Sequence, residues 1–255
     1  MRVDLNADLG ESFGPWPMGA DGALLDIITS ANIACGFHAG DPDVMAAAMA
    51  QAARNGVGIG AHPGLPDLQG FGRRRMEISL AAARNLTAYQ LGAAQAMARA
   101  AGGQVRHLKL HGALANMAAE DETLATACYE GALAVDPDII IMVISGTAQE
   151  RAARALNARM ACEIFADRAY TEDGLLMDRR QPGAVLHDPD EMAARILAML
   201  RAGAIITAQG THLPARIDTI CLHGDGPSAV AAAQKLRDTL QDAGVTLAQF
   251  DGARG

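Results

Sequence analysis

Four ionisable side chains in this sequence lie where a hydrophobic run gives way to a glycine. Asp8 closes one such run and His62 closes another, while Lys109 and His111 close a third. Carboxylates and imidazoles transfer protons at neutral pH, and an ammonium group stabilises negative charge that develops on a reacting oxygen. We therefore predict these four side chains as catalytic residues, positioned by strands that the apolar runs form.

A second group of polar residues lies on the same runs or in the loops that follow them. The candidate substrate-binding residues are Asn6, Glu11, His38, Asp167, Arg168, Arg180, His223 and Asp225. Arginine holds a carboxylate through two parallel hydrogen bonds, so Arg168 or Arg180 is expected to bind a substrate carboxylate. Arg179 is expected at the surface. Residues 171–188 form a long loop, which is typical of a lid or a binding segment.

Lys109 is unusual in this chain, because only two of the 21 basic residues are lysines, the other being Lys235. A lysine within an apolar strand loses hydration energy unless a counter-charge lies nearby. Asp4 and Asp8 are expected to supply that charge. A functional lysine is favoured over a structural ion pair.

Two other functions remain open. Oxygen and nitrogen ligands for a divalent metal are present on Asp8, His38, His62 and His111. They fit a metal-dependent hydrolase that acts on an N-acyl sugar. The other alternative is a protein that binds substrate or docks partners without catalysing a reaction. No phosphate-binding glycine motif occurs, so the sequence predicts no ATP site of the chain's own.

Apolar runs of strand length alternate with alanine-rich helical stretches along the whole chain, which predicts a parallel sheet built from β/α units. The expected strands are residues 3–7, 33–35, 57–61, 105–110, 139–144, 162–166, 204–207 and 217–222. The expected helices are residues 21–29, 42–55, 79–101, 120–135, 147–158, 189–202 and 227–243. Asp41 is expected to cap the second of these helices.

Polar residues on three of the expected strands distinguish a barrel from an open sheet. They recur with period two, as Asp4, Asn6 and Asp8; as Gly58, Gly60 and His62; and as His107, Lys109 and His111. An open parallel sheet lies under helices on both faces and is apolar on both. A barrel has an interior that opens to a polar pocket at the carboxyl ends of its strands. We therefore expect one TIM-like (β/α) barrel domain over residues 1–255, eight-stranded or irregular with seven strands.

The composition excludes several classes of protein. Half of the residues are hydrophobic, the net charge is −8 and only 4% are aromatic, which argues against a nucleic-acid-binding surface. The sequence has neither the start of a signal peptide nor a run of about 18 apolar residues, so we expect a cytoplasmic protein without a membrane partner. The four widely spaced cysteines predict neither disulfides nor a thiolate metal site.

Five ordered blocks of the sequence resemble the LamB/YcsF family, essentially from end to end. They read DLNADLGESFG (4–14), ANIACGFHAGDP (31–42), GAHPG (60–64) followed by GFGRR (70–74), FADR (165–168) and LHGD (222–225). Lys109 and His111 also match a family block. That block departs from the family at Leu110, where proline is typical, and at Ala115, where tyrosine is typical.

The resemblance implies a barrel of the glycoside hydrolase and polysaccharide deacetylase type. It also implies an ATP-dependent opening of 5-oxoproline to glutamate by a 5-oxoprolinase, in which this chain is the A subunit beside two partner subunits. ATP and Mg²⁺ are the implied cofactors, and the sequence leaves open whether this chain or the partners bind them. On that scheme Asp8 or His62 activates water and Lys109 stabilises the negative oxygen. His111 protonates the leaving nitrogen, and Arg168 or Arg180 holds the substrate carboxylate.

Overall fold

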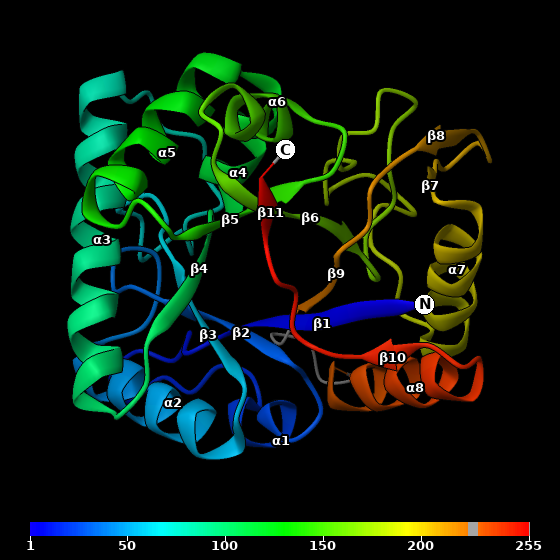
Figure 1. Cartoon of the computed structure of the whole chain (residues 1–255), viewed down its shortest axis with the longest axis horizontal. Helices are drawn as coiled ribbons and strands as arrows, with labels where there is room; N and C mark the ends of the chain where they lie inside the picture. Colours follow the sequence, from blue (N-terminus) through cyan, green and yellow to red (C-terminus); the bar gives the residue numbers. More distant parts are fainter. Residues whose placement is uncertain (224–228, 255) are drawn as a thin grey trace.

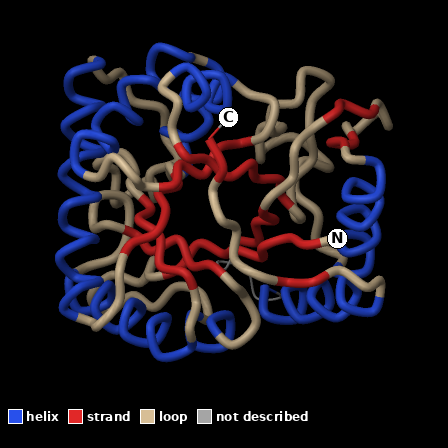
Figure 2. The backbone as a smooth tube through the Cα atoms, viewed as in Figure 1, coloured by secondary structure: helices blue, strands red, loops and turns tan. Residues whose placement is uncertain are grey.

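A closed parallel barrel forms the centre of the computed structural model, which describes residues 1–223 and 229–254 (Figure 1, Figure 2). Within these residues seven parallel strands make up the barrel: β1 (Arg2–Leu9), β2 (Ser30–Ala34), β3 (Gly58–His62), β4 (Val105–Lys109), β5 (Ile140–Ile144), β6 (Arg159–Phe165) and β9 (Thr219–His223). The barrel closes because β9 pairs with both β6 and β1. The predicted fold class is confirmed, in its seven-stranded form.

Helices surround the barrel, as the alternating sequence pattern predicts (Figure 2). They are α1 (Asp21–Leu25), α2 (Pro42–Asn55), α3 (Leu80–Ala100), α4 (Gly112–Glu120), α5 (Glu122–Val135), α6 (Ala148–Ala155), α7 (Pro189–Ala202) and α8 (Ala229–Asp242). Asp41 caps α2 as expected, by accepting hydrogen bonds from two backbone N–H groups. The short helix α4 was not predicted, because it begins at a glycine directly after the polar block at His111. No helix in the described part of the chain is long and apolar enough to cross a membrane.

One predicted barrel strand lies elsewhere. Residues 204–207 were expected to be a β/α unit of the barrel, but β7 (Ala204–Ile206) pairs antiparallel with β8 (His212–Pro214) in a separate two-stranded sheet. Its hydrophobic residues predicted a strand correctly but could not identify the partner strand. The chain therefore returns to the barrel only at β9.

The C-terminal segment closes the amino-terminal end of the barrel (Figure 1). There β10 (Thr246–Leu247) extends the sheet beside the start of β1, and β11 (Ala253–Arg254) pairs with the start of β6. Between them, Phe250 packs on inward-facing residues of β5 and β6. The opposite end, where the strands finish, is left for the functional site.

The barrel interior beneath that site is filled by a buried polar network. Asp4 accepts hydrogen bonds from the hydroxyl groups of Thr29, Ser30 and Thr219. Above it, the Asn32 side-chain amide donates to Asn6 at 2.7 Å and to Asp8 at 2.9 Å, and Asn32 accepts from His107. Buried polar groups are tolerated when they are hydrogen-bonded, so this network fixes the base of the pocket.

Gly60 provides the space for His107 in this network, because a Cβ atom at Gly60 would lie 2.0 Å from His107 Nε2. We expect Gly60→Ala to destabilise the protein by about 2 kcal/mol through overpacking. Thermal unfolding should then show a Tm about 4–8 °C lower. Gly92→Ala is the matched control, because a Cβ at that position in α3 meets nothing within 4 Å and alanine favours helix. An unchanged Tm for Gly60→Ala would contradict the expectation.

Candidate active site

The carboxyl ends of the barrel strands surround one cavity of about 680 Å³. Its lining includes Asp8 from β1, His62 from β3, Lys109 from β4, His223 from β9, and His111 directly after β4. The four predicted catalytic residues therefore share one cavity, because the ends of neighbouring parallel strands meet at one rim. Their individual chemical roles stay predictions.

Lys109 holds the centre of a buried charge cluster. Its Nζ atom donates to Asp8 Oδ1 at 2.9 Å, lies 2.8 Å from Glu163 Oε1, and lies 3.0 Å from Cys221 Sγ. The contacts with Asp8 and Cys221 are hydrogen bonds, and the contact with Glu163 is an ion pair. The expected contact with Asp8 is confirmed, whereas the expected contact with Asp4 is wrong, because Asp4 lies one layer below and accepts hydroxyl hydrogen bonds there.

The surroundings of this cluster shift its pKa values in opposite directions. Burial would lower the pKa of Lys109, but the negative charges around it, with Asp8 the strongest, hold that pKa well above its ordinary value. Burial would raise the pKa of Asp8, but His62 and Lys109 hold it well below the usual range. Burial also raises the pKa of Glu163, and Lys109 offsets this only in part. The site therefore contains a charged ammonium beside an ionised Asp8.

Two histidines next to the cluster have their tautomers fixed by backbone carbonyl groups. His62 Nδ1 lies 2.8 Å from the Lys109 carbonyl oxygen, and His111 Nε2 lies 2.8 Å from the Phe71 carbonyl oxygen. A carbonyl oxygen only accepts, so each of these nitrogens carries hydrogen. The remaining nitrogens, His62 Nε2 and His111 Nδ1, face each other at 3.0 Å.

His38 and Glu11 complete a buried group around these two histidines. The His38 ring stacks on His111 with ring centres 3.6 Å apart, and its Nε2 atom lies 3.4 Å from Glu11 Oε1. Burial and the neighbouring His62 lower the pKa of His38 well below its ordinary value. Burial and the neighbouring His38 do the same to the pKa of His111. Both rings are therefore neutral at physiological pH.

Asp167 and His223 form an oriented pair on the other side of the cavity. Arg179 donates to His223 Nε2 at 2.9 Å, so His223 Nδ1 carries hydrogen and donates to Asp167 Oδ2 at 2.7 Å. Burial would raise the pKa of Asp167, but His223 lowers it below its usual value. His223 Nε2 also lies 3.9 Å from Asp8 Oδ2, so this pair adjoins the Lys109 cluster.

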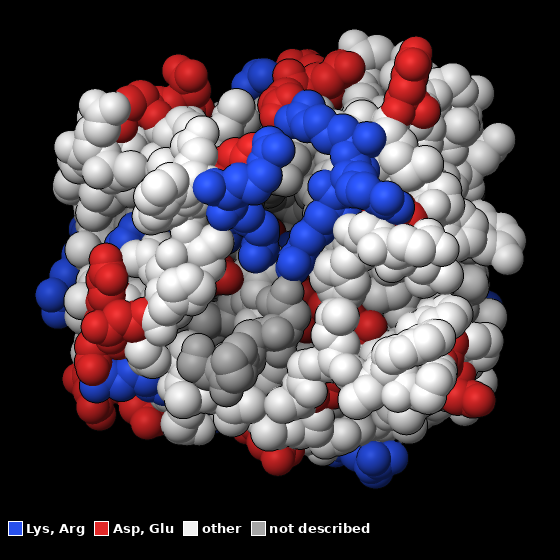
Figure 3. Space-filling view, turned by 180° about the vertical axis from the view of Figure 1, so that it is seen from behind, with Lys and Arg blue, Asp and Glu red and all other residues white. Residues whose placement is uncertain are grey.

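Arginines gather around the mouth of the cavity, although the chain has a net charge of −8 (Figure 3). Those that line it are Arg73, Arg74, Arg75, Arg168, Arg179 and Arg180. Arg74, Arg75 and Arg180 are paired with carboxylates, but arginines outnumber the acidic residues of the lining. A concave site with an excess of one sign of charge concentrates ligands of the opposite sign. The cavity is therefore suited to a small anionic ligand.

The arginines predicted to hold a carboxylate are engaged in other contacts. Arg168 is buried and donates to the Ala184 and Met177 carbonyl oxygens. These hydrogen bonds hold the loop of residues 177–184 beside the cavity. Arg180 is largely exposed and pairs with Asp178. Arg179, which we expected at the surface, instead reaches inward to His223. The carboxylate-binding roles of Arg168 and Arg180 stay predictions.

Two other predicted site residues, and one that was not predicted, remain to be placed in the structure. Asn6 is fully buried in the network below the cavity, and its substrate-binding role stays a prediction. Asp225, also a predicted substrate-binding residue, lies outside the described residues. Glu163 was missed, although it is a single charge within an apolar run, which is the same signal that singled out Lys109.

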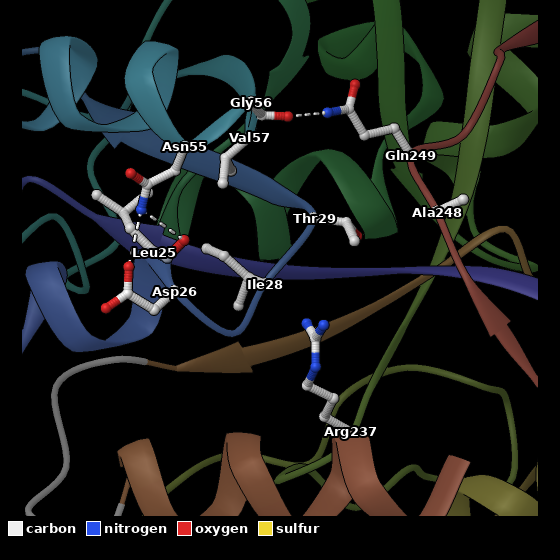
Figure 4. A pocket seen from close by; sticks show the side chains of 10 residues that line it. All are labelled: Leu25, Asp26, Ile28, Thr29, Asn55, Gly56, Val57, Arg237, Ala248 and Gln249. Atoms are coloured by element: carbon white, nitrogen blue, oxygen red, sulfur yellow. Dashed lines mark hydrogen bonds between the residues drawn. The ribbon is translucent and has the colours of Figure 1, made fainter. Parts of the chain in front are cut away.

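A second cavity, of about 560 Å³, lies at the opposite end of the barrel, beside the starts of β2 and β3 (Figure 4). Thr29, Val57, Arg237 and Gln249 are among its lining residues. Figure 4 shows the Gln249 amide directed at the Gly56 carbonyl group, to which it donates at 2.8 Å. Arg237 donates to the Ile27 carbonyl oxygen. None of the predicted site residues lines this cavity.

A closed parallel barrel with ionisable groups at the carboxyl ends of its strands is the arrangement of α/β-barrel enzymes. The chain belongs to the LamB/YcsF family, whose model matches residues 3–255. The resemblance predicted from the five sequence blocks is thereby confirmed.

Relatives and solved structures agree with this assignment. The chain is 66% identical over 250 residues to the 5-oxoprolinase A subunit of Ruegeria pomeroyi, covering 98% of this chain and 99% of the relative. A lactam utilization protein from Thermus thermophilus superposes with a TM-score of 0.92 at 41% identity, covering 98% of this chain and 100% of that one. The peptidoglycan N-acetylglucosamine deacetylase Bc1960 shares the fold alone, with a TM-score of 0.51 at 12% identity over 99% of this chain and 89% of that one.

Proposed function

We propose that this chain opens the lactam ring of 5-oxo-L-proline to give L-glutamate, as the A subunit of an ATP-dependent hydrolase with two partner subunits. The observation that carries the proposal is the arginine-rimmed cavity in which Asp8, Lys109 and His223 meet. Its size and charge suit a small carboxylate-bearing lactam. The name of the Ruegeria relative supports the choice of substrate.

The low reactivity of the lactam ring explains why ATP is needed in this proposal. A lactam carbonyl is a poor electrophile, and transfer of a phosphoryl group from ATP to its oxygen makes the ring carbon easier for water to attack. Attack by one water and cleavage of the C–N bond give a γ-glutamyl phosphate, which a second water hydrolyses to glutamate and phosphate. One 5-oxoproline, one ATP and two waters are thus converted to glutamate, ADP and phosphate. We assign ATP and Mg²⁺ to the partner subunits, because this chain has no phosphate-binding glycine motif.

The contacts of each group suggest its role. Asp8 is ionised and accepts the proton of the attacking water. Lys109 keeps Asp8 ionised and donates to the developing negative oxygen. That oxygen replaces the Cys221 sulfur, which is a weaker acceptor than Asp8. When Arg179 turns to the substrate carboxylate, His223 Nε2 is released, takes up the water proton from Asp8 Oδ2, 3.9 Å away, and delivers it to the ring nitrogen. Asp167 holds the other ring nitrogen of His223 during this transfer. The sequence suggested His111 for that last step, but its Nε2–H donates to the Phe71 backbone carbonyl and its Nδ1 faces His62 and not Asp8, so no path brings it the proton from Asp8.

Arg179 is the arginine of the rim that reaches His223, so we assign the substrate carboxylate to it. Arg179→Ala is expected to raise KM by about tenfold or more with a smaller fall in kcat, because a lost charge-assisted contact to an unreacting carboxylate weakens ground-state and transition-state binding alike. Arg180→Ala is the matched variant and should change KM less, since Arg180 is exposed and paired with Asp178. A larger rise in KM for Arg180→Ala than for Arg179→Ala would instead assign binding of the substrate carboxylate to Arg180.

The test of the proposed function is formation of glutamate from 5-oxoproline by the purified chain with and without the two partner subunits and ATP. Glutamate formation that requires this chain, the partners and ATP together supports the proposal. Full turnover by the partners alone would reduce this chain to a binding or docking role. Acetate release from an N-acetylated sugar by the chain alone would favour the deacetylase alternative.

A further inference from the structure

We propose that Glu11, His38, His62 and His111 bind one divalent transition-metal ion, with Zn²⁺ the best chemical match. One ligand atom from each of these four residues lies within 4.8 Å of all the others, and all four side chains are buried. Three imidazoles and one carboxylate form a ligand set that zinc commonly accepts. This inference concerns metal binding and does not depend on the identity of the substrate.

The first argument comes from the fixed tautomers of His62 and His111. Each ring donates its N–H to a backbone carbonyl group on the side away from the cluster. The two remaining nitrogens face each other 3.0 Å apart, and both lie in the group of four potential ligand atoms. A cation bound there takes a lone pair from each nitrogen. Histidines that bind metals characteristically donate their second N–H to a carbonyl or carboxylate, as both rings do here.

The second argument comes from the spacing of the ligand atoms. Zinc–ligand bonds of about 2.1 Å place the ligands of a tetrahedral ion about 3.4 Å from one another. Glu11 Oε1 lies 3.4 Å from His38 Nε2 and 3.6 Å from His111 Nδ1, and the two facing histidine nitrogens are 3.0 Å apart. These three pairs already have nearly the spacing that an ion requires. The His38 ring, which is stacked on His111 with an interplanar angle of 7°, must turn to direct its Nε2 lone pair at a shared ion.

The third argument comes from His38. The residue is 1% exposed, and neither of its ring nitrogens makes a hydrogen bond. An unsatisfied buried polar group destabilises a fold, whereas a metal bond satisfies one of these nitrogens. The loop above is fitted closely to the ligand rings, because a Cβ atom at Gly72 would lie 2.6 Å from His38 Cβ and 2.9 Å from His111 Cδ2. Gly72 thus allows the loop to lie directly against two of the ligand side chains.

A neighbouring group provides a contrast. Asp8, Cys221 and His223 also bring potential ligand atoms within 4.8 Å of one another. The Lys109 ammonium, however, lies 2.9 Å from Asp8 Oδ1 and 3.0 Å from Cys221 Sγ, so a cation is already present there. Metal binding is therefore inferred for the histidine group and not for this one. A bound ion would supply a Lewis acid beside Asp8, whose Oδ2 is 3.3 Å from His62 Nε2.

The test uses the full-length chain, stripped of metal with a chelator and titrated with Zn²⁺ by calorimetry and with Co²⁺ by visible absorption. We expect one saturable equivalent of Zn²⁺, the intense visible bands of tetrahedral Co²⁺, and a Tm that rises with bound metal. None of these readouts requires activity. Absence of saturable binding to the folded, metal-free chain would overturn the proposal.

Variants locate the site. Glu11→Gln and His38→Gln should each weaken Zn²⁺ binding by at least about a hundredfold, since even the loss of a group that only orients a ligand costs ten- to a hundredfold. His107→Gln, a buried histidine outside both groups, and Cys221→Ser are the controls and should retain one equivalent. Thermal unfolding of the metal-free forms separates loss of ligand from loss of fold. Binding of unchanged affinity in the folded Glu11→Gln/His38→Gln double variant would place the ion elsewhere and refute the assignment.

Discussion

Asp8→Asn is expected to reduce turnover of 5-oxoproline by about a hundredfold to ten-thousandfold, the range associated with loss of a general base. Asparagine keeps the shape of the side chain and can still accept from Asn32 and Lys109 through its oxygen. It cannot take a proton from water. The variant should remain folded, because Lys109 keeps its contact with Glu163. Glutamate formation in the complete enzyme, with unfolding followed in parallel, measures both effects.

The matched control for this variant is Asp4→Asn, on the same strand and one layer below. Asp4 is equally buried but accepts hydroxyl hydrogen bonds and does not line the cavity. Its replacement should lower Tm with little change in turnover of the folded protein. If the two variants lose activity equally, the effect of Asp8 arises from stability and not from proton transfer. Near-normal turnover by Asp8→Asn would assign the base to another group.

The sequence could predict the barrel because the decisive signal is local. Period-two polar residues on three strands require one interior and one helix-covered face, and parallel strands end at the same rim. That pattern alone places Asp8, His62, Lys109 and His111 on one cavity, as the structure does. The cap of α2 at Asp41 is predictable for the same reason, since it depends only on the next three residues.

The remaining features depend on tertiary contacts that local pattern does not specify. The run at β7 is strand-forming, but its partner is β8 and not a barrel strand. Arg179 and Arg180 are adjacent in the sequence, and only the path of the loop turns one inward to His223 and the other to solvent. The tautomers of His62 and His111 follow from two carbonyl groups whose positions no spacing rule gives. Glu163, in contrast, could have been predicted from the sequence. It is a single charged residue within an apolar run, as Lys109 is, and such a residue requires a buried partner.

Lys109→Met is expected to lower turnover by at least about a hundredfold, the size of effect seen when one preorganised donor to a developing negative charge is lost. It should also destabilise the protein by about 3–5 kcal/mol at neutral pH, because Asp8 and Glu163 lose their buried counter-charge. Methionine fills nearly the same volume, so packing changes little. Denaturant unfolding across pH and glutamate formation at neutral pH measure the two effects.

The pH dependence of that stability loss follows from Glu163. Burial raises its pKa in the folded chain, and Lys109→Met removes the charge that partly offsets the rise. A carboxyl whose folded pKa lies above its unfolded value contributes no penalty below the unfolded value, near 4.3, and an increasing one as pH rises. The deficit should therefore shrink as pH falls towards 4. Lys109→Met/Glu163→Gln removes the orphaned charge and should recover stability without recovering turnover. Recovery of both would show that Lys109 acts only by balancing Glu163, and a deficit that is independent of pH would contradict the buried-charge explanation.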